Sequence, residues 1–176
     1  MPIADGEKGS VAPSGGQSEA PQEEQEPVIV LAAVDTSPPA SRVVDMASRV
    51  VRRMWQNAQL HLVHVFHAGH LERGADPSLP LEELVDEAKE YLDYHVRIAQ
   101  RQCGRAVTGH FVEGDAEDEI VRLARSLGAD LVIVGTGDPS GIRRWLGGSV
   151  AEKVVKNAPC AVFVVRSKQR RYIKVA

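Results

Sequence analysis

The sequence predicts an α/β fold in which a parallel β-sheet is covered by helices on both faces. Two observations support this fold class. Short apolar runs alternate along the chain with longer segments in which apolar residues recur every three or four positions. The short runs are apolar almost throughout, as expected for strands buried on both faces of a sheet. Strands that alternate with helices in this way form parallel sheets.

The first elements follow Pro27. Residues 28–35, VIVLAAVD, form an apolar run that ends in an acid and predict the first strand. A TSPP turn leads to a helix over 40–58, and residues 59–66, QLHLVHVF, predict the second strand. The helix has one apolar face, built at three- and four-residue steps from Val43, Val44, Ala47, Val50, Val51 and Met54.

The second half continues the alternation after a loop over 68–80 that contains Gly and Pro. Pro80 and the acids that follow it suit the first turn of a helix. Gly128 is expected to end a later, shorter helix. The elements predicted here are a helix over 80–103, a strand over 106–115, a helix over 116–128, a strand over 129–135, a helix over 150–158 and a strand over 159–166.

The two ends of the chain differ in composition from the predicted domain, which spans 27–167. Residues 1–26 are dominated by Gly, Ser, Pro, Gln and Glu and contain no aromatic side chain. We expect this extension to be disordered, because it offers too little apolar area to offset the entropy lost on ordering. Residues 168–176 form a basic tail.

Composition and charge argue against several classes of function. The formal net charge is −3, and without a basic stripe nucleic acid is not expected as the main partner. The apolar runs are too short to cross a membrane, and the N-terminus lacks the features of a signal peptide. Cys103 and Cys160 form neither a disulfide framework nor a CxxC pair. We therefore expect two free thiols and a cytoplasmic protein.

A glycine-rich stretch, GTGDPSGIRRWLGGS over 135–149, lies between the fourth strand and the last helix. It lacks the lysine that a Walker loop places on the terminal phosphates, so it is not a P-loop. Gly135, Gly137 and Gly141 approximate a dinucleotide-binding fingerprint. That motif, however, belongs after the first strand of its unit and needs an acid at the end of the next strand, where this chain has Arg166.

Four segments resemble the universal stress protein family: VLAAVDTSPPASRVVDMA, LHLVHV, VEGDAEDEIVRLARSLGADLVIVGT and GIRRWLGGSVAEKVVKNAPCAVFVVR. Together the matching segments extend over about residues 27–166. The resemblance implies an adenine-nucleotide alpha-hydrolase-like fold with five parallel strands in the order 3-2-1-4-5. Family members are usually dimers, commonly through the fifth strand. Many bind ATP through the motif Gly-x2-Gly-x9-Gly-Ser/Thr, and others do not bind it.

The resemblance places most of that ATP motif on this chain. Gly135 matches the first glycine, and Gly148 with Ser149 matches the closing pair, which Val150 follows. Asp138 occupies the position of the second glycine. Gly148 and Ser149 also stand where the last helix starts, and free N–H groups there suit an anion. Ser149 equally suits the role of N-cap.

Two further residues match positions of the family that contact the nucleotide. Asp35 corresponds to the acid at the end of the first strand that contacts the nucleoside. Val65 corresponds to the second-strand position whose backbone meets adenine. If the first and fourth strands are neighbours, Asp35 and Gly135 face each other across one crevice at the carboxyl ends of the strands. The predicted nucleotide-binding set is Asp35, Val65, Gly135, Gly137, Asp138, Gly148, Ser149 and Val150.

Asp138 allows two interpretations. Asp138-Pro139-Ser140-Gly141 has the residue preferences of a type I turn, in which the carboxylate accepts a backbone N–H. A carboxylate at about 5 Å from phosphate, at an effective dielectric of about 20, costs about 3 kcal/mol. Alternatively, Asp138 is a ligand of a Mg²⁺ ion that also binds phosphate oxygens. In that case binding of ATP depends on the metal.

The histidines and the remaining polar residues give no catalytic set. His61, His64, His67 and His70 are spaced by three, which puts the first two on opposite faces of a strand. His67 and His70 lie beyond the strand end, where contact with a ligand is a better interpretation than a metal site. We expect no dedicated enzyme, and at most weak hydrolysis of ATP.

The fifth strand is expected to leave an apolar edge on the sheet, which pairing with a second copy would cover. We expect a homodimer through Ala161, Val162, Phe163, Val164 and Val165. The first functional hypothesis is a stress-response switch that binds an adenine nucleotide. The alternative is a dimeric stress-response module of the same fold with a degenerate site, which acts through protein contacts.

Overall fold

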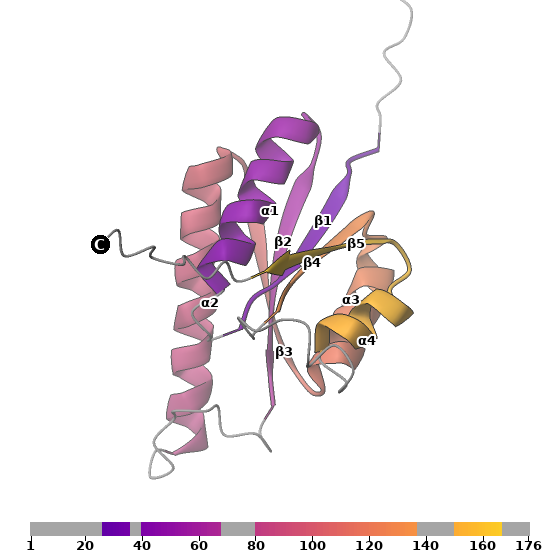
Figure 1. Ribbon diagram of the computed structural model, residues 1–176. Coiled ribbons are helices and arrows are strands. Elements are labelled where there is room, and N and C mark those ends of the chain that lie inside the picture. Colours follow the sequence, from indigo (N-terminus) through magenta and orange to yellow (C-terminus); the bar gives the residue numbers. More distant parts are fainter. Residues whose placement is uncertain (1–25, 36–39, 68–79, 137–149, 167–176) are drawn as a thin grey trace, which may run out of the picture.

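The computed structural model describes residues 26–35, 40–67, 80–136 and 150–166 (Figure 1). Helices and strands alternate along the chain, as predicted. The elements are β1 (Ile29–Ala33), α1 (Ala40–Met54), β2 (Gln59–Phe66), α2 (Leu81–Cys103), β3 (Val107–Glu113), α3 (Ala116–Leu127), β4 (Leu131–Thr136), α4 (Val150–Asn157) and β5 (Ala161–Arg166).

The strands form one parallel sheet in the order β3-β2-β1-β4-β5. This confirms the order 3-2-1-4-5 and places β1 at the centre. In register, Ala33 lies opposite Val63 of β2, and Val30 lies opposite Leu131 of β4. The chain first builds the sheet from β1 outward through β2 and β3, and then returns to the other side of β1. The order of the strands therefore reverses between β1 and β4.

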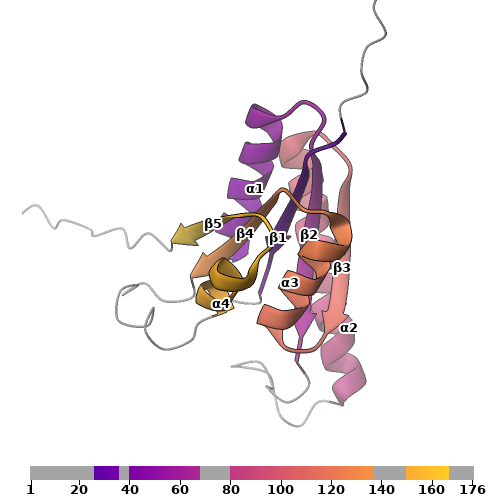
Figure 2. The same cartoon turned by 90° about the vertical axis from the view of Figure 1, so that its right-hand side faces the viewer.

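Helices cover both faces of the sheet, as Figures 1 and 2 show. α1 and α2 pack together on one face, and α3 and α4 pack together on the other. Residues of β1 alternate between the two cores. Val30 and Ala32 belong to the cluster under α1 and α2, whereas Leu31 belongs to the cluster under α3 and α4. All three are fully buried, which is why this strand is apolar at every position.

Several predicted boundaries differ from the observed ones. β1 ends at Ala33 rather than Asp35, and α1 ends at Met54 rather than residue 58. Pro80 precedes the first residue of α2 instead of lying in its first turn. Gly128 has a left-handed backbone, with φ of 64°, and follows the last residue of α3, as predicted.

The predicted extension over 1–26 and the tail over 168–176 lie outside the described residues, apart from Glu26. Within the described ranges, no helix is long and apolar enough to cross a membrane. Cys103 and Cys160 are both free thiols, the first buried and the second half-buried, as expected.

Candidate functional site

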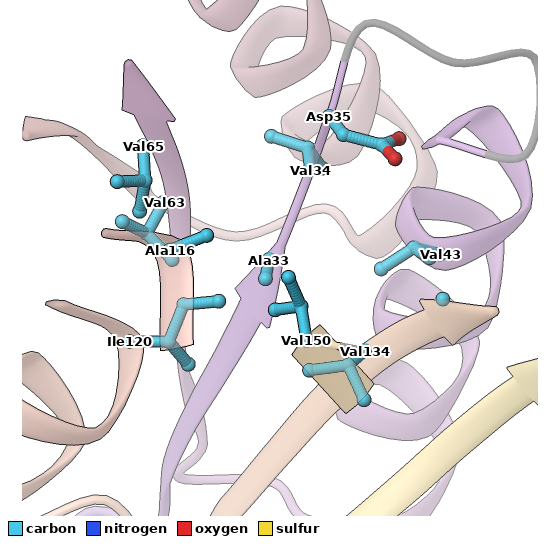
Figure 3. A pocket seen from close by; sticks show the side chains of 11 residues that line it. Ala33, Val34, Asp35, Val43, Val63, Val65, Ala116, Ile120, Val134 and Val150 are labelled. Atoms are coloured by element: carbon cyan, nitrogen blue, oxygen red, sulfur yellow. The ribbon is translucent and has the colours of Figure 1, made fainter. Parts of the chain in front are cut away.

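A pocket lies at the carboxyl ends of β1, β2 and β4, and Figure 3 shows the side chains around it. Its described lining combines strand ends with residues of α1, α3 and α4. These residues are Ala33, Val34, Asp35, Val43, Val63, Val65, Ala116, Ile120, Val134, Gly135 and Val150.

The topology of the sheet explains why a pocket forms here. The chain leaves β1 for α1 on one face, whereas α4 follows β4 on the opposite face. Neighbouring strands whose connections leave in opposite directions open a crevice at their carboxyl ends. The pocket lies at this point of reversal, with Val43 of α1 on one side and Ile120 of α3 on the other (Figure 3).

Four of the eight residues predicted to bind a nucleotide line this one pocket. They are Val65 of β2, Gly135 of β4, Val150 of α4, and Asp35, which lies two residues beyond the end of β1. The structure thus brings Asp35 and Gly135 to one crevice, as the sequence predicted. The other four, Gly137, Asp138, Gly148 and Ser149, lie outside the described residues.

The walls of the pocket are mostly apolar. Val63 and Val134 are buried strand residues, Val34 is buried directly after β1, and all three line it. Asp35 is exposed just beyond the end of β1 and is the one charged residue among the described lining residues. A flat apolar group with a polar rim fits such a lining, because the apolar walls exclude water while the carboxylate accepts hydrogen bonds.

The backbone of Val65 adds polar groups to the wall. The carbonyl of Val63 accepts a 2.9 Å hydrogen bond from the N–H of Val34, whereas the carbonyl of Phe66 bonds toward β3. Backbone groups of alternate residues in a parallel strand face the same neighbour, so those of Val65 face the β1 side. Pairing of β2 with β1 ends at Ala33. The N–H and C=O groups of Val65, a residue of the lining, therefore lie on the β1 side beyond the last registered pair.

Two helices begin at the pocket. Ala116 is the first residue of α3 and Val150 the first residue of α4, and both line it. The first N–H groups of a helix have no partner within the helix and carry its positive dipole end. Val150 is 39% exposed. The first N–H groups of α3 and α4 therefore lie at the pocket, and the first turn of α3 also carries Glu117, Asp118 and Glu119.

Side chains from β2 and α2 hold the end of β1 in place. The ring of His64, which is 1% exposed, forms a 3.0 Å hydrogen bond through Nδ1 with the carbonyl of Val34. The hydroxyl of Tyr91 donates a 2.9 Å hydrogen bond to the carbonyl of Asp35. Sequence reasoning missed both supporting roles, because they join segments that are distant in the chain.

Gly135 lies where α1 packs closely against the end of β4. A methyl group added there would lie 3.1 Å from Cγ2 of Val43, which is closer than an ordinary contact. Gly135 still pairs in register with Val165 of β5. A glycine at this position keeps α1 close to the end of β4.

The other predicted histidines lie elsewhere. His67 Nδ1 lies 3.1 Å from the carbonyl of Gly114 and 3.3 Å from Oδ1 of Asp115. His61 pairs with His110 through a 2.9 Å contact between ring nitrogens. Burial lowers the pKa of both, and the charge of His110 lowers that of His61 further. No group of three metal-binding side chains occurs within the described ranges, and His70 lies outside them.

The strand order, the helical layers and the crevice at the reversal define an open α/β protein of the adenine-nucleotide alpha-hydrolase-like fold. The family model described as the universal stress protein family matches residues 29–166. Universal stress protein A homolog 1 of Coxiella burnetii is 32% identical over 145 residues, which cover 80% of this chain and 96% of the relative. The chain belongs to the universal stress protein family.

Solved structures show the same architecture. The universal stress protein of Archaeoglobus fulgidus in complex with dAMP is 26% identical, with a TM-score of 0.56, over 78% of this chain and 96% of the other. A universal stress protein in complex with cAMP is 24% identical, with a TM-score of 0.60, over 78% of this chain and 96% of the other. The second likeness supports the fold alone.

Proposed function

We propose that this chain binds an adenine nucleotide, ATP, in the pocket at the ends of β1, β2 and β4, and acts as a cytoplasmic stress-response switch. The observation that carries the proposal is the convergence of Asp35, Val65, Gly135 and Val150 on that single pocket. The family resemblance selected these positions from the sequence, and the fold brings them together from four elements.

Each part of the pocket suits one part of a nucleotide. The apolar side chains of Val34, Val63 and Val134 offer a surface for the adenine ring. The backbone groups of Val65 suit the polar edge of the base, as hydrogen bonds to a main chain give specificity without charge. The carboxylate of Asp35 would accept hydrogen bonds from ribose hydroxyls. The start of α4 at Val150 suits the phosphates.

The relatives support the adenine assignment. The Archaeoglobus fulgidus family member was solved with dAMP, and the pocket here has the same position in the fold as the ligand crevice of open α/β sheets. We propose a binding switch rather than a dedicated enzyme, because no nucleophile with an adjacent base lines the described part of the pocket.

Mass spectrometry of small molecules released from the denatured purified protein tests the proposal directly. We expect an adenine nucleotide. Calorimetric titration with ATP should then show binding that Asp35→Ala weakens by roughly tenfold, the value of a lost hydrogen bond to a charged group. Asp93→Ala is the matched control, since Asp93 is an exposed acid of α2 away from the pocket. Equal affinities for wild type and Asp35→Ala would contradict the proposed site.

Asp138 favours a second function, a dimeric module with a degenerate site that acts through protein contacts. Its carboxylate replaces the second glycine of the family's ATP motif. Repulsion of phosphate would leave the pocket without a nucleotide, unless Mg²⁺ bridges the two. ATP titrations of wild type and Asp138→Gly, each in Mg²⁺ and in EDTA, separate these cases. A role as metal ligand requires weaker binding by Asp138→Gly in Mg²⁺, and a repulsive role requires tighter binding by that variant in EDTA.

We also propose that the protein works as a homodimer through β5. β5 is the last strand on its side of the sheet, and Phe163 in its middle is 43% exposed. A strand edge with an exposed apolar side chain is stabilised by pairing with a second copy around a two-fold axis. Light scattering at micromolar concentration should give twice the mass of the chain.

A further inference from the structure

A second, polar groove lies between α1 and α2, which run side by side on one face of the sheet (Figure 1). Its lining comes from the middle and C-terminal half of α1 and from the last turn of α2. These residues are Asp45, Ser48, Arg49, Arg52, Arg101 and Gln102. The ends of α1 and α2 precede β2 and β3, so the groove lies toward the amino ends of the strands, away from the nucleotide pocket.

Positive charge dominates this groove. Arg49, Arg52 and Arg101 are exposed, and none of them forms an ion pair with an acid of the described chain. Arg49 Nε donates a 3.2 Å hydrogen bond to the carbonyl of Asp45, one turn earlier in α1. Three guanidinium groups thus surround the groove opposite a single carboxylate.

Arginines near a helix C-terminus also have a structural role, because their charge offsets the negative end of the helix dipole. Arg52 and Arg101 lie in the last turns of α1 and α2. Arg53 does so too, yet it does not line the groove. The dipole therefore accounts for arginines at these helix ends, but not for the polar groups buried between them.

Two residues of the lining each carry a buried polar atom without a hydrogen-bond partner in the described structure. One is the hydroxyl oxygen of Ser48, a residue that is 1% exposed. The other is Oε1 of Gln102. The amide of Gln102 is oriented by Asp45, since Nε2 donates a 2.5 Å hydrogen bond to Oδ1 of that carboxylate. Between the two helices, the Ser48 hydroxyl is thus a donor and the Gln102 carbonyl an acceptor that no described group satisfies. Buried polar groups without partners cost free energy, so a ligand that pairs with both is favoured.

We propose that this groove binds a protonated phosphate, either inorganic phosphate or a phosphomonoester. The guanidinium groups match the geometry of phosphate oxygens, and the hydroxyl of Ser48 donates to one more. Near neutral pH a phosphate group keeps a proton for part of the time, and this P–O–H group donates to Oε1 of Gln102. Sulfate has no proton at that pH, so the acceptors of the groove select against it.

The test is titration of the full-length protein with inorganic phosphate, glycerol phosphate and sulfate at constant ionic strength. The readout is the NMR signal of the Gln102 side-chain amide, which reports on this groove alone. We expect phosphate to shift that signal saturably and sulfate to bind at least about tenfold more weakly, the value of one hydrogen bond involving a charged group. Glycerol phosphate distinguishes the two sources, since tighter binding than inorganic phosphate indicates a phosphomonoester.

Variants of the groove sharpen the test. Arg52→Gln and Arg101→Gln should each weaken phosphate binding by roughly tenfold, and Ser48→Ala should weaken it by a smaller factor. Arg53→Gln, at the neighbouring position of α1, is the matched control and should leave the affinity unchanged. Circular dichroism confirms that each variant is folded. Equal binding of sulfate and phosphate, an equal loss in Arg53→Gln, or no shift of the Gln102 signal would each overturn the proposal.

Discussion

The hydroxyl of Tyr91 donates a 2.9 Å hydrogen bond to the backbone carbonyl of Asp35. A helix that packs on the outside of the sheet thereby holds a residue that lines the pocket at the ends of β1, β2 and β4. The carboxylate of Asp35 can be oriented only if its backbone is fixed, so this contact connects α2 to the proposed binding of ribose.

Tyr91→Phe removes that hydrogen bond while keeping the ring. We expect the free energy of unfolding to fall by about 0.5–1.5 kcal/mol, the net value of one hydrogen bond, and the affinity for ATP to fall by a factor of a few. Chemical denaturation and calorimetry measure the two effects. Tyr94→Phe is the control, because Tyr94 lies on the same helix and is 51% exposed. A loss of ATP affinity in Tyr94→Phe as large as that in Tyr91→Phe would contradict this role.

Gly135→Ala should weaken ATP binding with little change in stability. The added methyl group meets Cγ2 of Val43 at 3.1 Å, which pushes α1 outward or narrows the pocket. Alanine is favoured over glycine in a strand by about 0.5–1 kcal/mol, which offsets part of the crowding. The double variant Gly135→Ala/Val43→Ala should recover affinity, as measured by calorimetry. Failure of the second substitution to restore binding would show that Gly135 matters for another reason.

The pair of His61 and His110 predicts a loss of stability in acid. The pKa of each is lowered in the folded protein from an ordinary value of 6.5, mainly by burial. As the pH falls below that value, the unfolded chain binds more protons than the folded one, so the free energy of unfolding decreases. Above it both rings are neutral in either state, and the pair adds no pH dependence. Thermal melts between pH 5 and about 7.5, the range in which histidine titrates, should show the fall in wild type. The slope should be shallower in His61→Gln/His110→Gln, and an unchanged slope would rule out this origin.

Phe163→Asp should convert the proposed dimer into a monomer. A charge in the middle of β5 would face its own copy across a two-fold axis and repel it. Val155→Asp is the matched control, because Val155 is also 43% exposed but lies on helix α4 rather than on the edge strand. Analytical ultracentrifugation distinguishes the two masses. A monomeric wild type, or dissociation in both variants alike, would contradict the interface.

The fold was predictable because its signals are local. The apolar run around Leu31 indicates a strand buried on both faces, and Gly128 indicates a helix end, without knowledge of distant residues. The contacts at the end of β1 were harder to predict from the sequence. The carbonyls of Val34 and Asp35 bond to His64 and Tyr91, and nothing near residue 34 reveals those partners.

The pocket was predictable only in part. The resemblance to the family supplied Asp35 and Val65, which periodicity and spacing alone would not have singled out. The groove between α1 and α2, which we propose binds phosphate, gave no sequence signal, because Arg52 and Arg101 are ordinary residues for the last turn of a helix. Arg52 and Arg101 form a candidate site only together with Ser48 and Gln102, and the packing of α1 against α2 places these residues around one groove.

The contact between the β1 and β4 segments has a consequence for how the chain folds during synthesis. The N–H of Ile29 bonds to the carboxylate of Asp130, which is 101 residues further along the chain. Contacts between residues so far apart in the chain raise the contact order, which correlates with slower folding. During synthesis β1 must wait for β4 to leave the ribosome, and no pocket exists before then. A nucleotide that binds only the closed sheet would select completed molecules and stabilise them by mass action.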